Sequence, residues 1–378
     1  MQITGIVCEY NPLHLGHKKQ IELLKARGHA VVCLMSGNYV QRGYPAIFNK
    51  MVRAEAALAC GADLVLELPI QYALSSAEGF ASGAVSILSR ICDNICFGSE
   101  TPDTEKLMNT AEALLCPAFS DKLRVHLDAG LSFPAARAAA LVDLGLDSQV
   151  LETPNNILAV EYCKAILSQN SDLKPIVIHR QGSYHDTLPN PENPSATALR
   201  KMMESGDNWH AYVPDAAIPI YESAIFHRLA NGHKAILYRL RTMDDAEFES
   251  LPYGSEGLWR KLMHASRTYA DLESIIAATK SKRYTRTRID RMIMCAFLGI
   301  TEQIRCSPSP YCRVLGINDL GRTILHDVKS TGFFLNIGDK TGSPQEILEQ
   351  RCTALYGLFA EQAEDPEKEQ KSRLIYHK

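Results

Sequence analysis

The chain has 378 residues, of which 46% are hydrophobic and 22% charged, and its formal net charge is −3. This composition is typical of a folded globular protein and excludes an intrinsically disordered chain, while the length predicts about two domains. Because the net charge is slightly negative, any nucleic-acid surface must be a local basic patch. The longest apolar runs, residues 30–35 and 64–68, are too short to cross a bilayer.

The first residues lack a basic segment and a cleavage site, so we expect no signal peptide. The eleven cysteines are an odd number, and several of them lie inside apolar stretches. No two cysteines form a Cys-x-x-Cys pair. This usage favours reduced, buried thiols in a cytoplasmic protein over disulfides, and we expect no metal held by protein side chains.

The first two hundred residues alternate between strand-like and helix-like segments. Strands are predicted at residues 4–8, 30–35, 63–68, 94–97 and 175–179. Helical spacing of apolar residues marks the intervening segments 16–27, 51–60, 76–89 and 157–168. The alternation predicts an α/β fold with a Rossmann-like, doubly wound parallel sheet, in which ligands bind beyond the carboxyl ends of the strands.

After Pro194 the pattern becomes mostly helical. Helices are predicted at residues 196–204, 223–229, 235–241, 258–267, 271–280 and 286–298, with one later strand at 311–316. We therefore expect an α/β domain over residues 1–205 and a mostly helical domain over residues 206–378. The charged tail, residues 361–378, is expected to fray.

The sharpest motif lies where the first strand meets the first helix, in residues 5–17 (GIVCEYNPLHLGH). Gly16 lets a phosphate or a purine ring approach the backbone, and the N-terminus of the helix favours negative charge. His14 and His17 are three residues apart, so both can face one phosphate chain and stabilise charge during attack on phosphorus. A simpler interpretation is that these two polar residues only cap the helix.

This segment resembles the nucleotidyltransferase superfamily with the HIGH-type signature, whose members transfer an adenylyl group from ATP. A second signature of that superfamily is matched by residues 195–200 (SATALR), which open a new helix. Ser195 and Thr197 would hold the outer phosphates there, and Arg200 would neutralise the departing pyrophosphate. The alternative is a serine that caps the helix beside a solvated arginine.

Further stretches across nearly the whole chain resemble the bacterial tRNA(Met) cytidine acetate ligases. They are residues 9–14, 35–43, 61–69, 97–100, 153–158 and 281–288. The resemblance implies that acetate is activated by ATP as acetyl-adenylate and then passed to N4 of the wobble cytidine in the anticodon loop of elongator tRNA(Met). Residues 1–205 would then be the nucleotidyltransferase-like, ATP-binding catalytic domain, and residues 206–378 the tRNA-binding domain. Mg²⁺ is expected to accompany ATP, although the sequence shows no carboxylate cage for it.

The resemblance also implies a set of ATP-binding residues, with His14, His17 and Arg200 as the catalytic groups. The first part of the set is Val7, Cys8, Glu9, Tyr10, Asn11, Pro12, Leu13, His14, Leu15, Gly16, His17, Lys18, Lys19 and Gln20. The second part is Gly98, either Asn155 or Asn156, and Arg180, together with Ser195 and Thr197. The lysines, including Lys50, could equally belong to solvated helix faces, and the asparagines could equally be helix caps.

Two other segments have candidate roles. The glycine-bracketed residues 35–43 could line a pocket for a small acid, or could be an ordinary surface loop. Residues 280–291 hold six basic residues and one acidic residue. Lys280, Lys282, Arg283, Arg286 and Arg288 are predicted to contact RNA phosphates, with Tyr284 as a stacking platform; a solvated helix face is the alternative.

Two alternatives to the ligase remain open at this point. A small-molecule adenylyltransferase of cofactor biosynthesis would share the first domain but would not need the basic segment. A non-catalytic RNA-binding factor would not need His14, His17 and Arg200. The residues themselves leave the acyl group, the choice of tRNA and the oligomeric state open.

Overall fold

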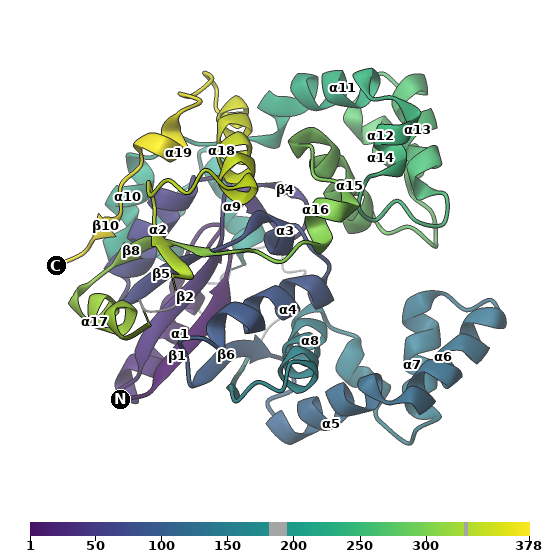
Figure 1. The fold of residues 1–378 in the computed structure, drawn as a ribbon, viewed down its shortest axis with the longest axis horizontal. Helices are drawn as coiled ribbons and strands as arrows, with labels where there is room; N and C mark the ends of the chain where they lie inside the picture. Colours follow the sequence, from purple (N-terminus) through teal and green to yellow (C-terminus); the bar gives the residue numbers. More distant parts are fainter. Residues whose placement is uncertain (181–194, 329–331) are drawn as a thin grey trace.

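The computed structural model describes residues 1–180, 195–328 and 332–378, and its centre is a largely parallel β-sheet (Figure 1). The strand order is β10-β8-β5-β2-β1-β6-β7, with β9 paired to β8. The strands are β1 (Ile3–Cys8), β2 (Ala30–Ser36), β5 (Leu64–Leu68), β6 (Asn94–Ser99), β7 (Lys174–His179), β8 (Cys312–Ile317), β9 (Phe334–Asn336) and β10 (Ile375–Tyr376). A short antiparallel hairpin is formed by β3 (Tyr39–Val40) and β4 (Tyr44–Pro45).

The five strands predicted in the first two hundred residues are all present. From β1 the chain proceeds to β2 and β5 on one side and to β6 and β7 on the other, with parallel pairing throughout. The strand order therefore reverses between β1 and β6. In a doubly wound sheet this reversal opens a crevice at the carboxyl ends of the two strands, where ligands bind.

Helices cover both faces of the sheet, which explains the apolar runs of its central strands. Side chains of β2 alternate: Val32 and Leu34 join the core beneath α4 (Ala77–Leu88) and α8 (Pro154–Ser168), while Val31 and Cys33 join the core beneath α1 (Leu15–Ala26) and α2 (Lys50–Ala59). β2 is consequently buried over its whole length. Two further helices in this half are α3 (Ile70–Ala73) and α5 (Thr104–Leu115), and α6 (Pro117–Asp128) and α7 (Phe133–Val142) extend from α5 as an arm (Figure 1).

Most of the later chain is helical, as predicted. The helices are α9 (Ala196–Ser205), α10 (Ile218–Glu222), α11 (His233–Thr242), α12 (Asp245–Glu249), α13 (Leu258–Thr268), α14 (Leu272–Thr279), α15 (Arg286–Leu298), α16 (Glu302–Cys306), α17 (Asp319–Val328), α18 (Pro344–Tyr356) and α19 (Lys368–Lys371). Helices α11–α16 gather beside the sheet around a core that includes Leu262, Ile276 and Ile293 (Figure 1). No helix in the described part of the chain is both long and apolar enough to span a membrane.

Three features differ from the sequence predictions. A boundary at residue 205 does not separate the sheet, because β8 pairs antiparallel with β5, and β9 and β10 pair with β8. The predicted helix at residues 223–229 does not form, because the backbone amides of His227 and Arg228 pair with the carbonyls of Ile47 and Phe359. The tail does not fray: β10 extends the sheet, and Glu369 on α19 is buried.

A buried ion cluster fixes that tail. Lys50 Nζ lies 2.8 Å from a Glu67 carboxylate oxygen and 2.7 Å from a Glu369 oxygen, and all three side chains are buried. Lys50 therefore compensates carboxylates of β5 and α19, which removes it from the candidate phosphate ligands. Glu349 of α18 lies against the same cluster, and burial together with Glu67 raises the pKa of Glu349 to about 8.

Candidate active site

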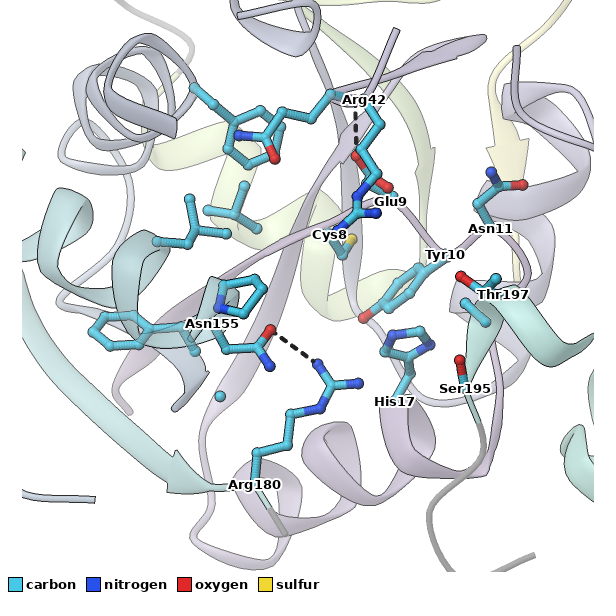
Figure 2. A pocket seen from close by; sticks show the side chains of 18 of the residues that line it. Cys8, Glu9, Tyr10, Asn11, His17, Arg42, Asn155, Arg180, Ser195 and Thr197 are labelled. Carbon is cyan, nitrogen blue, oxygen red and sulfur yellow. Dashed lines mark hydrogen bonds between the residues drawn. The ribbon is translucent and has the colours of Figure 1, made fainter. Parts of the chain in front are cut away.

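A cavity of about 270 Å³ opens at the carboxyl ends of β1 and β6, where the strand order reverses (Figure 2). Its polar lining comes from the loop after β1, from the start of α1, from the β3–β4 hairpin, from α8, from the end of β7 and from α9. These residues are Glu9, Tyr10, Asn11, His14, His17, Gln20, Gln41, Arg42, Tyr44, Asn155, Arg180, Ser195, Thr197 and Arg200. Val7, Cys8 and Gly98 also reach the cavity.

The balance of charge in this lining favours an anion. Arg42, Arg180 and Arg200 are its arginines, and Glu9 is the one carboxylate among the described lining residues. Figure 2 shows Arg42 and Arg180 entering the cavity from opposite sides of the view. The cavity also receives the N-terminal ends of α1 and α9, whose free amides favour negative charge. A polyphosphate is the ligand that this combination suits.

His14 and His17 lie at the N-terminal end of α1, with His14 as the N-cap and His17 in the first turn. The His14 carbonyl accepts the amides of His17 and Lys18 at 2.9 and 3.1 Å, so His14 begins the helix in an extended conformation. The His14 ring is 1% exposed, and neither of its nitrogens has a hydrogen-bond partner among the described residues. A buried, unpartnered imidazole beside a cavity is an incomplete hydrogen-bond site that a ligand can satisfy.

Both imidazoles are neutral at physiological pH. Burial, followed by the charges of Arg180 and Arg200, lowers the pKa of His14 to about 3. Burial, followed by His14 and Arg180, holds the pKa of His17 well below its usual range. His17 Nδ1 accepts the His14 amide at 3.3 Å, so the proton of a neutral His17 ring lies on Nε2. His17 can therefore donate one hydrogen bond to a phosphate oxygen.

Arg200 spans from α9 to the loop after β1. Its Nη1 donates to the Asn11 carbonyl at 2.7 Å, and its Nη2 donates to the Thr197 hydroxyl at 3.0 Å and to the Tyr44 hydroxyl at 3.3 Å. These bonds hold the guanidinium at the cavity wall. Ser195 precedes α9 without a side-chain capping bond to the helix, so its hydroxyl is not used as a helix cap.

The two neighbouring asparagines have different environments. Asn155 lines the cavity, where its Oδ1 accepts from Arg180 Nη1 at 3.4 Å and its Nδ2 donates to Glu100 at 2.6 Å. Asn156 is 3% exposed, and its Oδ1 accepts from the Ser99 hydroxyl at 2.6 Å. Asn155 thus faces the cavity, whereas Asn156 is hydrogen-bonded to the loop after β6.

Several residues in the expected ATP-binding set are not among the described residues that line the cavity, because the helix and loop turn them elsewhere. They are Pro12, Leu13, Leu15, Gly16, Lys18, Lys19 and Asn156. Leu13 is fully buried, and its amide donates to the Tyr221 hydroxyl at 3.0 Å. Lys18 pairs with Glu22 at 3.4 Å on the outer face of α1. Gly16 lies against the His14 ring: a Cβ at residue 16 would be only 3.1 Å from His14 Cε1, so a glycine there leaves room for the ring.

Part of the lining was not predicted from the sequence. One wall is apolar and comes from Ala77, Phe80, Phe97, Pro154, Leu158, Ala159 and Tyr162. Their spacing on strands and helices is that of ordinary core residues, so periodicity gives no signal for them, and the family resemblance includes Phe97, Pro154 and Leu158 only within the stretches 97–100 and 153–158. Gln41 and Arg42 had a partial signal in the glycine-bracketed residues 35–43, whose second half belongs to the hairpin at the cavity, whereas Tyr44 follows that segment and was not predicted.

The basic segment, residues 280–291, lies outside the cavity and at the start of α15. Arg286 forms a bidentate pair with Glu273 at 2.7 Å, Arg283 pairs with Glu256 at 3.0 Å, and Arg288 donates to the Tyr253 carbonyl at 2.9 Å. Its two lysines, Lys280 and Lys282, are exposed and form no ion pair with any described residue.

The predicted stacking platform is wrong. Tyr284 is only 9% exposed, and its hydroxyl donates to the Glu256 carbonyl at 2.6 Å. Its ring belongs to the core of the helical region, where it packs among apolar residues. Tyr284 is therefore a buried core residue that lies between exposed basic residues in the sequence.

Residues 1–180, 195–328 and 332–378 contain no group of three His, Cys, Asp or Glu side chains that could hold a metal ion. The donor set at the cavity is mainly nitrogen donors of arginine and histidine, with Glu9 as the only carboxylate among the described lining residues. This chemistry suits phosphate oxygens directly. Mg²⁺ would arrive as part of the nucleotide substrate, where phosphates and water supply its ligands.

Comparisons with known proteins agree with this geometry. The family model described as HIGH Nucleotidyl Transferase matches residues 1–372. The chain is 39% identical to the tRNA(Met) cytidine acetate ligase of Clostridium novyi, over 87% of this chain and 88% of the relative. It is 38% identical to the same enzyme of Clostridium tetani, over 95% and 96% of the two chains.

Two solved structures from Thermotoga maritima are similar over 100% of both chains at 28% identity. The apo form of that protein, TmcAL, superposes with a TM-score of 0.89. The form bound with alpha-thio ATP superposes with a TM-score of 0.87. Sequence identity and overall architecture thus agree along essentially the whole length, and the chain belongs to the tRNA(Met) cytidine acetate ligase family of HIGH nucleotidyltransferases.

Proposed function

We propose that the chain is an ATP-dependent ligase that acetylates N4 of the wobble cytidine in elongator tRNA(Met). The observation that carries the proposal is the cavity at the strand reversal, where His14, His17, Arg180 and Arg200 surround space suited to a triphosphate. A family relative of similar architecture has been solved with alpha-thio ATP. The relatives' names supply tRNA(Met), cytidine and acetate as the other substrates.

The first half-reaction joins acetate to AMP. An acetate oxygen attacks the α-phosphorus of ATP, the bond to the bridging oxygen breaks, and pyrophosphate leaves. In our assignment His17 donates from Nε2 to an α-phosphate oxygen, and Arg200 with the α9 N-terminus carries the charge of the leaving pyrophosphate. The protein supplies positioning and charge stabilisation, so the step needs no covalent enzyme intermediate.

The nucleotide is further held by Asn155 and Arg180 in this proposal. Arg180 donates a hydrogen bond to Asn155, and Asn155 donates one to Glu100, so the three side chains form a hydrogen-bonded network near the ends of β6 and β7. Gly98 lies beneath Arg180, and a Cβ at residue 98 would lie 3.5 Å from Arg180 Cδ. An amide and a guanidinium at this point can hydrogen-bond ribose and phosphate oxygens.

The acetate site belongs to the β3–β4 hairpin in this proposal. Arg42 enters the cavity beside Glu9 (Figure 2), and its guanidinium suits the carboxylate of a small acid. Substituting Arg42→Met should raise the KM for acetate more than it changes the affinity for ATP. An equal loss of ATP affinity would instead assign Arg42 to the phosphates.

The second half-reaction transfers the acetyl group to RNA. The exocyclic amine of an unstacked cytidine attacks the acetyl carbon, AMP leaves, and the amine loses a proton. We assign the RNA contacts to the region after residue 205, with Lys280, Lys282, Arg283, Arg286 and Arg288 at phosphates. Exposure of the two lysines supports this assignment, whereas the ion pairs of Arg283 and Arg286 reduce their free charge.

The decisive experiment incubates the protein with tRNA, ATP and isotopically labelled acetate, and analyses tRNA nucleosides by mass spectrometry. The expected product is labelled N4-acetylcytidine in tRNA(Met), formed with AMP and pyrophosphate. A matched reaction with His17→Ala separates this activity from a contaminating one. ATP binding without labelled nucleoside would favour a small-molecule adenylyltransferase, and no ATP binding would favour a non-catalytic RNA-binding factor.

A further inference from the structure

The β3–β4 hairpin connects the cavity to α15. Its turn is closed by the Gly43 amide, which donates to the Val40 carbonyl at 2.9 Å. Gln41 and Arg42 at the tip line the cavity, as does Tyr44 on the return strand. The position of this short turn therefore sets the shape of one cavity wall.

The hairpin tip is anchored from three elements outside itself. The Gln41 amide donates to Glu9 Oε1 at 2.8 Å, which ties the tip to the end of β1. The Tyr44 hydroxyl accepts from Arg200 at 3.3 Å, which ties it to α9. The Gln41 carbonyl accepts from Arg291 Nη1 at 3.4 Å, which ties it to α15.

Close packing reinforces the contact with α15. Gly43 has a φ of +87°, and a Cβ built on it would lie 2.4 Å from the Arg291 amide nitrogen and 2.5 Å from the Asp290 carbonyl carbon. Any side chain at residue 43 would therefore be strained by its backbone conformation and would also overlap the α15 backbone. The backbone of the hairpin tip is therefore in close contact with the backbone of α15 at this point.

Arg291 differs from Arg283 and Arg286, the arginines of its segment that pair with exposed carboxylates. Its guanidinium lies over the Tyr253 ring, 5.2 Å from the centroid, whereas Arg283 and Arg286 face exposed carboxylates. Its Nε is buried and has no hydrogen-bond partner within the described part of the chain. The guanidinium is thus directed inward, between the helical core and the hairpin, and away from the surface proposed to meet RNA.

We propose that Arg291 is a positioning residue for the first half-reaction: with Gly43 it fixes the hairpin tip, and so holds Gln41 and Arg42 at the cavity wall. The inference rests on the proposed function for the identity of the substrates. It assigns to one residue of the basic segment a role in the adenylation site, and it predicts that this residue acts through Gln41 and Arg42 without touching the nucleotide.

The test compares variants of the full-length chain. Arg291→Met removes the guanidinium at similar length, and Arg291→Lys keeps a cation over Tyr253 without the planar guanidinium. Arg305→Met is the matched control, because the Arg305 guanidinium also lies over the Tyr253 ring, 5.6 Å from its centroid, and pairs with Glu302. Lys282→Ala, from the same basic segment, is the comparison for an RNA contact. Calorimetry gives the Kd for ATP, and acetate-dependent ATP–pyrophosphate exchange gives the KM for acetate. Loss of one hydrogen bond corresponds to a change of about 3- to 10-fold.

We expect Arg291→Met to raise the KM for acetate, or the Kd for ATP, by about 3- to 10-fold, with partial recovery in Arg291→Lys. Arg305→Met, which removes a second guanidinium over the Tyr253 ring, should leave both values within about twofold, and Lys282→Ala should weaken tRNA binding. KM and Kd do not depend on the fraction of folded enzyme, so an effect on them is not explained by instability alone. Gly43→Ala should reproduce the effect from the hairpin side.

Two results would overturn the proposal. Unchanged Kd and KM in Arg291→Met with a lowered Tm would show that Arg291 only stabilises the fold. Unchanged Kd and KM with a flattened salt dependence of tRNA binding, as in Lys282→Ala, would make it an RNA contact. Failure of the proposed function is distinguishable from both: wild-type protein would then bind ATP without acetate-dependent exchange, and the ATP Kd values of the variants would still be comparable.

Discussion

The imidazole rings of His14 and His17 stack with their centroids 3.6 Å apart and their planes 21° from parallel. Two rings at this distance cannot both be charged without strong repulsion, and their lowered pKa values agree with that restriction. The pair therefore lines the cavity as neutral imidazoles, while Arg180 and Arg200 carry positive charge there.

Replacement of His17 should affect chemistry more than folding. His17→Ala is expected to lower acetate-dependent ATP–pyrophosphate exchange by about 10²–10³-fold, the usual loss for one donor to a developing charge. Its ring accepts one hydrogen bond from the His14 amide, at 3.3 Å. Lys19→Ala, from the same helix but outside the cavity, is the control. If a folded His17→Ala protein catalysed ATP–pyrophosphate exchange at a near-normal rate, His17 would not be the donor to the α-phosphate.

Acid should destabilise the empty protein partly through His14. Its folded-state pKa of about 3 lies below the ordinary value of 6.5, so the unfolded chain binds this proton first. The stability contributed by neutral His14 is fully present above pH 6.5 and is lost as the pH falls toward 3. Between pH 7 and 4.5 this amounts to about 2–3 kcal/mol. Urea unfolding of wild type and His14→Asn at both pH values should show a smaller loss in the variant; equal losses would contradict the shift.

The two asparagines of α8 should separate ligand binding from stability. Asn155→Ala is expected to weaken ATP binding, measured by calorimetry, with little change in Tm. Asn156→Ala should lower the free energy of unfolding by about 1–3 kcal/mol, because it removes the hydrogen bonds of the buried Asn156 amide to the Ser99 hydroxyl and to the amide and hydroxyl of Thr101. The reverse pattern would place Asn156 at the nucleotide.

The tRNA surface should depend more on lysines than on arginines of the basic segment. Lys280→Ala with Lys282→Ala removes two cations that pair with no described residue, so the slope of log K against log salt should flatten by about two units. Arg286→Ala should change the slope by less than about one unit, because Glu273 already compensates that charge. Exchange of ATP and pyrophosphate serves as the control and should stay within about twofold. An unchanged slope in the lysine variant would move the RNA surface elsewhere.

The ion cluster beneath the tail should be a large contributor to stability. Lys50→Met leaves the carboxylates of Glu67 and Glu369 buried without their cation, and is expected to cost about 3–5 kcal/mol. The tail should then become sensitive to limited proteolysis near residue 369. A double variant, Lys50→Met with Glu369→Gln, should recover part of the loss. If Lys50→Met were as stable as wild type, Glu67 or Glu369 would be able to bind a proton in place of the lysine, and the prediction would be wrong.

The local sequence is sufficient to predict the five parallel strands β1, β2, β5, β6 and β7 and the edge of the sheet where the cavity lies. Apolar runs such as residues 30–35 indicate buried strands because both faces of β2 are covered, and helical spacing identifies α1, α2, α4 and α8. The motif around His14 and His17 is predictable for the same reason: a strand end, a short loop and a helix start are determined by adjacent residues. Arg200 needs the family resemblance as well, because it lies far from His14 in the chain.

Only the tertiary structure decided which residues of each motif face the cavity and how distant segments combine. It separated Asn155 from Asn156, turned Arg291 and Tyr284 inward from a segment whose composition indicates uniform exposure, and brought β8 and β10 into the sheet. Local sequence specifies periodicity and turns, whereas the direction of a side chain at a helix start depends on what packs against that helix. Lys50 shows the same dependence, because its partner Glu369 is 319 residues away and compensates a charge that the local pattern places in solvent.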